Sequence, residues 1–199
     1  MRIIGITGTL GAGKGTIVEY LVANHGFQHY SVRAYLTREI ERREMPLNRD
    51  SMVKVANELR ANNSPSFIAE ELYREAAANG ADCIIESIRT PGEIDALQDA
   101  GNFTLLAVDA PARTRYDRIL KRGSSTDQVD FETFVANEER EMTTTDPNAQ
   151  NLKTCMGRAD FALDNSGSFE ALYAQVEVTL RRIKPAGSSL QTESKNKHV

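Results

Sequence analysis

The stretch that decides the fold is Gly8-Thr9-Leu10-Gly11-Ala12-Gly13-Lys14-Gly15-Thr16. An apolar run, residues 2–7, precedes it and is expected to form a buried strand, whereas the residues after it have helical periodicity. Strand, glycine-rich loop and helix in this order let successive backbone N–H groups and the helix N-terminus converge on phosphate oxygens. The sequence therefore predicts a phosphate-binding loop.

The composition limits how such a phosphate can be attracted. The chain has 199 residues, with 24 Lys or Arg and 28 Asp or Glu, so its formal charge is −4. This length suits one domain with a substantial core. Because the chain is acidic, binding to nucleic acid or to a membrane surface is not expected, and no apolar run is long enough to span a bilayer. We expect a cytoplasmic protein, with Cys83 and Cys155 as core thiols, in which a local group of cations holds any polyanion.

Apolar runs alternate with helical patterns along the chain. Strands are expected at 2–7, 27–31, 81–87, 103–109 and 159–165. Helices are expected at 17–25, 33–44, 50–61, from Ser64-Pro65 to Gly80, from the capping box Thr90-Pro91-Gly92-Glu93, and at 112–122, 131–142 and 169–183. Parallel strands need helical crossovers, so the pattern predicts a three-layer α/β/α fold with a five-stranded parallel sheet. One domain over 1–184 and a disordered tail at 185–199 are expected.

The loop also indicates how a nucleotide is held. Lys14 is expected to lie along the β- and γ-phosphates of ATP, and the Thr16 hydroxyl to reach a phosphate oxygen or a water of Mg²⁺. Gly15 stands directly after the lysine, where most such loops have the Ser or Thr that ligates the metal. Magnesium is therefore expected to be held mostly through water and the nucleotide.

Two stretches carry a resemblance to known kinases. The loop, with its Lys14-Gly15-Thr16 ending, resembles the P-loop of adenylate kinase and related nucleoside monophosphate kinases. Residues 159–167 and the helix after them are similar to the last strand and helix of dephospho-CoA kinase, in which the following loop lies beside the adenine. The resemblance implies a P-loop kinase fold that binds ATP through Gly8, Leu10, Gly11, Ala12, Gly13, Lys14, Gly15, Thr16 and Asn165.

Arginines follow the second predicted strand, within a helical region at about 31–80 that is expected to bind the acceptor. No Asp or Glu occurs from Leu21 to Arg38, where dephospho-CoA kinases place an Asp. Guanidinium groups bind phosphate bidentately, so an acceptor phosphate is expected here. The expected acceptor-binding residues are Ser31, Arg33, Arg38 and Arg89.

Glu86 ends the third predicted strand, three residues before Arg89. It resembles the carboxylate that such kinases keep for magnesium-bound water, and Arg89 resembles the arginine that monophosphate kinases use on the acceptor phosphate. Alternatively, Glu86 is the base for an acceptor hydroxyl, as a comparable Glu is in deoxynucleoside kinases.

A basic helix and an acidic helix form the expected lid, at about 112–147. Between Pro111 and Gly123 five cations stand against the single acid Asp117. Arg118 and Arg122 are four apart and share a helix face, so they resemble the lid arginines that stabilise the transferred phosphoryl group. The helix at 131–142 could pair with the basic helix when the lid shuts.

The favoured prediction is a kinase that transfers the γ-phosphoryl group of Mg·ATP to a nucleoside or deoxynucleoside monophosphate, as a monomer or homodimer. Lys14, Arg118, Arg122 and Glu86 are the expected catalytic residues, and Thr16 and Glu86 the expected magnesium residues. Two alternatives stay open: a hydroxyl-accepting kinase such as dephospho-CoA kinase, and a module that senses nucleotides without turnover.

Overall fold

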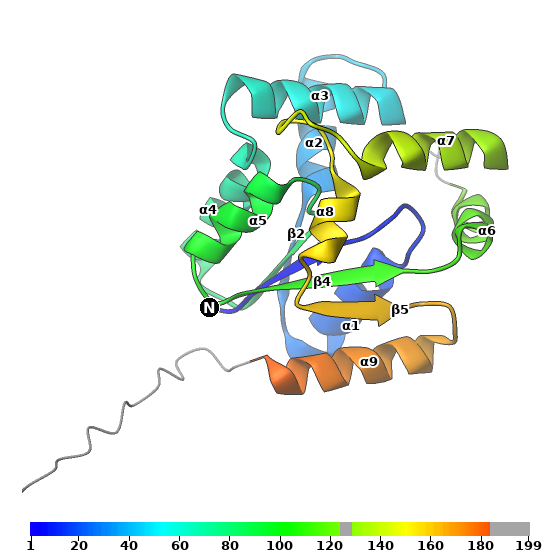
Figure 1. The fold of residues 1–199 in the computed structure, drawn as a ribbon. Coiled ribbons are helices and arrows are strands. Elements are labelled where there is room, and N and C mark those ends of the chain that lie inside the picture. The colour runs from blue at the N-terminus through cyan, green and yellow to red at the C-terminus, as the bar shows by residue number, and fades with distance from the viewer. Residues whose placement is uncertain (124–128, 184–199) are drawn as a thin grey trace, which may run out of the picture.

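The strand that leads into the glycine-rich loop lies at the centre of the sheet. The computed structural model describes residues 1–123 and 129–183. Five strands run parallel in the order β2-β3-β1-β4-β5. They are β1 (Ile3–Thr7), β2 (Gln28–Ser31), β3 (Cys83–Glu86), β4 (Phe103–Asp109) and β5 (Phe161–Asp164). The predicted parallel sheet is confirmed, and the carboxyl ends of all its strands meet at one edge (Figure 1).

Helices cover both faces of this sheet, as predicted (Figure 1). One face packs against α1 (Lys14–His25) and α9 (Phe169–Arg182). The opposite face packs against α2 (Val32–Arg42), α3 (Arg49–Asn62), α4 (Phe67–Asn79), α5 (Pro91–Asp99) and α8 (Leu152–Gly157). The pair α6 (Ala112–Arg122) and α7 (Phe131–Met142) extends beyond the carboxyl edge of β4 and β5.

Alternation of side chains along the strands divides the core in two. In β1, Ile3 points to the layer of α2–α5, whereas Ile4 and Ile6 point to α1 and α9. Cys83 and Cys155 are buried thiols in the first of these clusters, as predicted. Burial raises the pKa of Cys83 to about 11 and that of Cys155 to about 12, so both are protonated at neutral pH.

The structure differs from the sequence prediction at two places. The helix expected to begin at Ser64-Pro65 begins at Phe67, because the preceding residues form a turn in which Phe67 N donates to the Ser64 carbonyl at 3.1 Å. The short helix α8 was not predicted; its N-cap, Asn151, accepts a bond from Thr154 N at 3.1 Å. The capping box Thr90/Glu93 at the start of α5 is confirmed. The predicted tail, 185–199, and residues 124–128 of the predicted lid lie outside the described residues.

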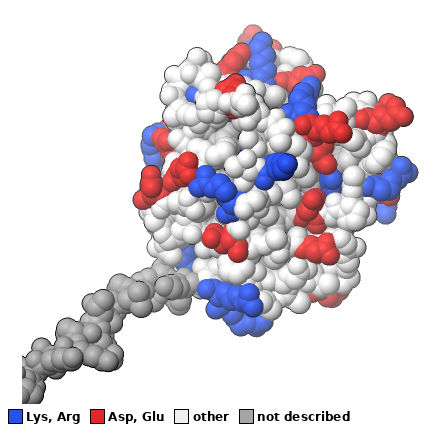
Figure 2. All heavy atoms as spheres, in the orientation of Figure 1, with Lys and Arg blue, Asp and Glu red and all other residues white. Residues whose placement is uncertain are grey.

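Charge on the surface is mixed. On the face drawn in Figure 2, acidic and basic side chains alternate without a broad patch of one sign. Within residues 1–123 and 129–183, no helix has both the length and the apolar character that crossing a membrane requires.

Candidate active site

The glycine-rich loop connects the carboxyl end of β1 to the first turn of α1. Gly13 is the N-cap of α1 and has a φ of 103°, a backbone conformation that side-chain-bearing residues rarely adopt. A Cβ on Gly13 would lie 2.1 Å from Nδ2 of Asn165. No acidic residue occurs in the first turn of α1, so the positive end of this helix is available to an anion.

Three side chains from neighbouring elements fix the shape of the loop. Thr9 Oγ1 donates to Asp109 Oδ1 at 2.5 Å, and Asn165 Nδ2 donates to the Ala12 carbonyl at 2.8 Å. Arg115 Nη1 donates to the Leu10 carbonyl at 3.2 Å. The loop is thus supported by residues at the ends of β4 and β5 and by helix α6. The contact from Asn165 is to the backbone of the loop.

Lys14 extends from the start of α1 into the same region. Its Nζ donates to the carbonyls of Gly8 and Thr9 at 2.8 and 2.9 Å. Burial is the main reason that its pKa falls to about 7; Arg89 and Arg122 lower it further, and Glu86 and Glu141 oppose the shift. An anion beside Lys14 would favour its charged form, so this ammonium group is set to respond to a phosphate.

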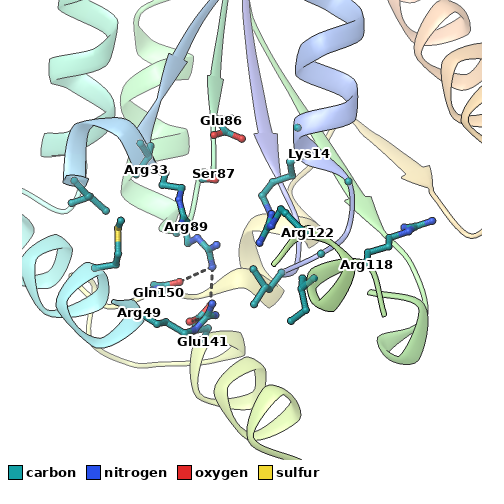
Figure 3. Close-up of a pocket in the computed structure, with 18 of the residues that line it drawn as sticks. Lys14, Arg33, Arg49, Glu86, Ser87, Arg89, Arg118, Arg122, Glu141 and Gln150 are labelled. Carbon is teal, nitrogen blue, oxygen red and sulfur yellow. Dashed lines mark hydrogen bonds and ion pairs between the residues drawn. The ribbon is translucent and has the colours of Figure 1, made fainter. Parts of the chain in front are cut away.

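One cavity of about 510 Å³ joins the loop to α2, α3 and the end of β3. Figure 3 shows its charged lining residues. Among the predicted site residues, those that line the cavity are Leu10, Gly11, Gly13, Lys14, Gly15, Thr16, Arg33, Glu86, Arg89, Arg118, Arg122 and Asn165. Gly8 and Ala12 belong to the loop but do not line the cavity, and Ser31 reaches it only through its contact with Glu86.

Glu86 lies at the carboxyl end of β3, next to the loop strand. Its Oε1 accepts a bond from Ser31 Oγ at 3.0 Å and lies 3.6 Å from His29 Nε2. Burial raises the pKa of Glu86, but His29, Lys14 and Ser31 together outweigh burial and hold it below its usual value. The carboxylate is therefore ionised at neutral pH and can accept a proton or a hydrogen bond. His29 was not among the residues predicted for the site.

Ser87, the next residue, directs the chain away from the sheet. It lines the cavity and has a φ of 67°, which is unusual for a residue other than glycine. Strained backbone of this kind is found at binding and catalytic sites more often than elsewhere. The turn leads from Glu86 to Arg89, so both side chains reach one cavity.

Arg89 lies across the cavity from Lys14, in a cluster that sequence analysis missed (Figure 3). Its Nη1 donates to Glu141 Oε2 and to Gln150 Oε1, both at 2.8 Å. Arg49 Nη2, from the first residue of α3, donates to Glu141 Oε1 at 2.5 Å. We call these four residues the Glu141 cluster. No local pattern pointed to this cluster, because Arg49 and Glu141 lie 92 residues apart in the chain.

A second buried arginine lines the apolar side of the cavity. Arg60 of α3 and Glu93 of α5 form an ion pair of 2.7 Å, and their side chains are 1% and 0% exposed. Nη1 of Arg60 is buried and has no hydrogen-bond partner among the described residues. The surrounding wall is apolar and is formed by Val32, Leu36, Met52, Val53 and Ala56.

The predicted acceptor residue Arg38 does not belong to this cavity. It lies on the exposed side of α2, 3.5 Å from Glu75 and over the ring of Tyr35. Arg33 does line the cavity, and a residue five positions later is rotated by about 140° around a helix, so the two arginines cannot share one face. The prediction that Arg38 reaches the acceptor site was wrong for this structure.

The two predicted lid arginines lie differently. Arg122 points toward Lys14, whereas Arg118 extends away from it (Figure 3). Arg118 Nη2 donates to the Asn165 carbonyl at 2.8 Å, near the exposed ring of Phe169. Of the two arginines predicted for a lid, Arg122 is the one near the expected phosphate positions.

Helices α6 and α7 are joined by Arg115 and Glu138. Arg115 is 4% exposed, and its guanidinium makes a two-point ion pair with Glu138, with Nη2 and Oε1 2.8 Å apart. The predicted pairing between the acidic and the basic helix is thus present, through a pair that sequence analysis did not single out.

The residues predicted for magnesium share the cavity. Thr16 and Glu86 both line it, and hydroxyl and carboxylate oxygens are ligands that Mg²⁺ accepts. Within the described parts of the chain no group of three or more His, Cys, Asp or Glu could hold a metal ion. This donor set fits an ion that arrives with nucleotide phosphates and keeps several waters.

Comparison with known proteins identifies the family of this chain. A family model described as an AAA domain, AAA_18, matches residues 4–146, which include the loop, helices α6 and α7, and all members of the Glu141 cluster except Gln150. The chain belongs to the AAA_18 family. Similar to this AAA_18 chain are UPF0200 proteins of Methanococcus maripaludis (strain C7) and Methanocaldococcus jannaschii, each 28% identical over 186 residues. The alignments cover 92% of this chain and 98% and 91% of the two relatives.

Solved structures show the same fold. TT1252 from Thermus thermophilus aligns with a TM-score of 0.56 at 22% identity, over 92% of this AAA_18 chain and 98% of its own. A sugar kinase from Janibacter aligns with a TM-score of 0.54 at 19% identity, over 96% and 99%. Shikimate kinase from Aquifex aeolicus aligns with a TM-score of 0.50 at 12% identity, over 91% and 97%. The fold is that of P-loop kinases, and the likeness extends to no particular acceptor.

Proposed function

We propose that this protein transfers the γ-phosphoryl group of Mg·ATP to the phosphate of a nucleoside or deoxynucleoside monophosphate. The observation that carries the proposal is that one cavity has the phosphate-binding loop at one end and Arg89, with Arg49, at the other. Guanidinium groups that share a cavity with the loop suit a second phosphate group, because the paired N–H donors of a guanidinium match the oxygens of a phosphate.

The donor half of the proposed site consists of the loop, Lys14 and Arg122. The loop N–H groups and Lys14 would bind the β- and γ-phosphates, which restore the charge of a lysine whose pKa is about 7 in the free protein. Mg²⁺, brought with the nucleotide and held through Thr16, Glu86 and water, would neutralise charge on the phosphates. Arg122 would stabilise charge on the transferring group, and Arg118 would act nearer the adenine, beside Asn165.

The acceptor half of the proposed site consists of Arg33, Arg89 and the apolar wall. Arg89 would hold the acceptor phosphate in line with the γ-phosphate, and the wall on α2 and α3 would cover the sugar and base. An anionic acceptor needs no base, so Glu86 would order the magnesium waters in this scheme.

A coupled assay of ADP release with a panel of monophosphates tests the proposal. Arg89→Met is expected to raise the KM for the acceptor at least tenfold, because a charge-assisted contact to phosphate is lost. Arg38→Met is the matched control: it removes the same group from outside the cavity and is expected to leave the KM unchanged. Turnover of no monophosphate, or equal effects of the two variants, would reject the proposal.

Glu86 supports a second candidate, a kinase with a hydroxyl acceptor such as dephospho-CoA. Its ionised carboxylate faces the cavity and could take the proton from an attacking hydroxyl. Glu86→Gln would then lower kcat by about 10²- to 10⁴-fold for that acceptor while Mg·ATP binding is retained. Turnover of dephospho-CoA alone would establish this candidate; binding of nucleotide without turnover of any acceptor would indicate a nucleotide sensor instead.

A further inference from the structure

In the Glu141 cluster, two arginines hold the carboxylate of Glu141 in the way in which they would hold a bound anion. Arg49 and Arg89 approach Glu141 from different elements, at 2.5 and 2.8 Å, one to each carboxylate oxygen. The Glu141 side chain is only 5% exposed. A carboxylate and a phosphate present the same kind of oxygens to a guanidinium fork, so a site built for one also accommodates the other.

The location of the cluster connects this arrangement with the reaction. Arg49, Arg89, Glu141 and Gln150 all line the cavity that contains the phosphate-binding loop. Arg49 Nη2 and Arg89 Nη1 each donate to one oxygen of Glu141, so neither of these two donors is available to an acceptor phosphate while Glu141 remains between them. The side chain must therefore leave if these two donors are to bind a substrate.

The position of Glu141 in its helix allows such a movement. It is the residue before the last in α7, and the C-cap residue Thr143 is already extended. The last turn of a helix opens more readily than its centre, since its carbonyl groups lack partners within the helix. The central part of α7 stays attached to α6 through Glu138 and Arg115.

We propose that Glu141 is an internal ligand of the anion site formed by Arg49 and Arg89, and that the acceptor phosphate displaces it. The ligand is a phosphate monoester, which carries more oxygens and more negative charge than one carboxylate and can therefore replace it. Glu141 thereby sets specificity: a neutral or weakly anionic acceptor leaves the arginines paired with Glu141. The identity of the ligand rests on the proposed function, whereas the competition between anions does not.

The test measures binding of inorganic phosphate by isothermal titration calorimetry, with the full chain and without turnover. Glu141→Gln removes the competing charge and is expected to tighten phosphate binding about tenfold. Glu139→Gln is the matched control, because it makes the same change of charge on the exposed face of α7 and is expected to have no effect. The double variant Glu141→Gln/Arg49→Met is expected to lose the gain, which separates this site from phosphate bound at the P-loop.

Each other outcome overturns the proposal. Weaker or unchanged phosphate binding in Glu141→Gln means that Glu141 only positions the arginines, and an equal gain in Glu139→Gln means a general effect of charge. Should Glu141→Gln not fold in a urea titration, Glu141→Asp keeps the charge but shortens the reach; a gain of about threefold is then expected, and a loss overturns the proposal. Failure to phosphorylate any monophosphate would reject the proposed function. It would not change the conclusion about the competition between Glu141 and phosphate, which rests on the binding measurements alone.

Discussion

Arg115 Nη2 donates to Glu138 Oε1 at 2.8 Å, and the same guanidinium contacts the carbonyl of Leu10 in the phosphate-binding loop. The pair therefore connects α6 and α7 to the loop. Arg115 Nε also donates to the Ala110 carbonyl at 2.7 Å, so nearly all of its donors are used within the protein. This arginine supports the nucleotide site without extending into it.

Arg115→Met is expected to lower the free energy of unfolding by about 2–3 kcal/mol and to weaken ATP binding, because the half-buried carboxylate of Glu138 loses its partner and the Leu10 carbonyl loses a donor. Urea unfolding and calorimetry measure the two effects. Arg113→Met is the control on the same helix: its side chain is 70% exposed, and a change below about 0.5 kcal/mol is expected. Similar losses in the two variants would contradict a supporting role for Arg115.

Alanine substitutions in the loop are expected to have opposite effects at two glycines. Gly13→Ala should destabilise the protein by about 1–3 kcal/mol, since Gly13 has a φ of 103° and its Cβ would meet Asn165. Gly15→Ala should stabilise it by about 0.5–1 kcal/mol, since Gly15 is helical and no atom lies within 4 Å of its Cβ. Thermal and urea unfolding measure the change in stability of each variant. Two changes of the same sign would contradict the backbone geometry described for these glycines.

Binding of ATP is expected to take up a proton through Lys14. Its pKa is about 7 in the free protein, so at pH 8 most molecules carry a neutral Lys14, and the phosphates then favour the charged form. Affinity should fall as pH rises above 7, by up to tenfold for each pH unit. Calorimetry at pH 8 in two buffers of different ionisation enthalpy measures the proton, and Lys14→Met should abolish this uptake.

The same pKa predicts a gain in stability on removing this lysine. The pKa of Lys14 is about 10.5 in the unfolded chain and about 7 in the folded chain, so between these pH values the unfolded chain carries the proton and the folded chain does not. Lys14 therefore destabilises the fold fully below pH 7, and this effect fades as pH rises toward 10.5. Lys14→Met should be more stable than the natural protein at pH 7, with a smaller difference at pH 9; an equal difference at both would show that the lysine is not desolvated.

Arg60 and Glu93 are expected to show the full effect of a broken buried pair. Arg60→Met leaves Glu93 without its cation, and a loss of about 3–5 kcal/mol in the free energy of unfolding follows. Arg74→Met is the exposed comparison: Arg74 pairs with Glu70 and Glu71, its side chain is 62% exposed, and about 0–1 kcal/mol is expected. If the two losses are alike, the buried pair contributes no more than a surface pair.

The sequence predicted the sheet and the loop well, because both depend on local pattern. Runs such as 105–108 are apolar along their length, and the glycine-rich loop has few structural alternatives. The short helix α8 was not predicted, because six residues are too few to show a helical periodicity. The order of strands could not be read, since it depends on contacts far apart in the chain.

Prediction of the cavity was less complete, for a physical reason. Arg38 was predicted to bind the acceptor because it follows the second strand in a stretch without acidic residues, but the face that it occupies depends on how α2 packs. Arg49 and Glu141 lie 92 residues apart and looked like ordinary surface charges until the fold placed them together. A sequence shows the sign of each charge but not the direction in which the side chain points. Arginines bound to partners therefore cannot be told from arginines that face solvent.

Two carboxylates of α7, three residues apart, bind arginines of different elements. Glu138 binds Arg115, which contacts the phosphate-binding loop, and Glu141 binds Arg49 and Arg89, which line the cavity. Residues three apart differ by about 60° around a helix, and one inserted residue would add about 100°. Only one helical phase of α7 thus satisfies both arginine partners, and the chain should accept changes of side chain along α7 far more readily than a change in its length.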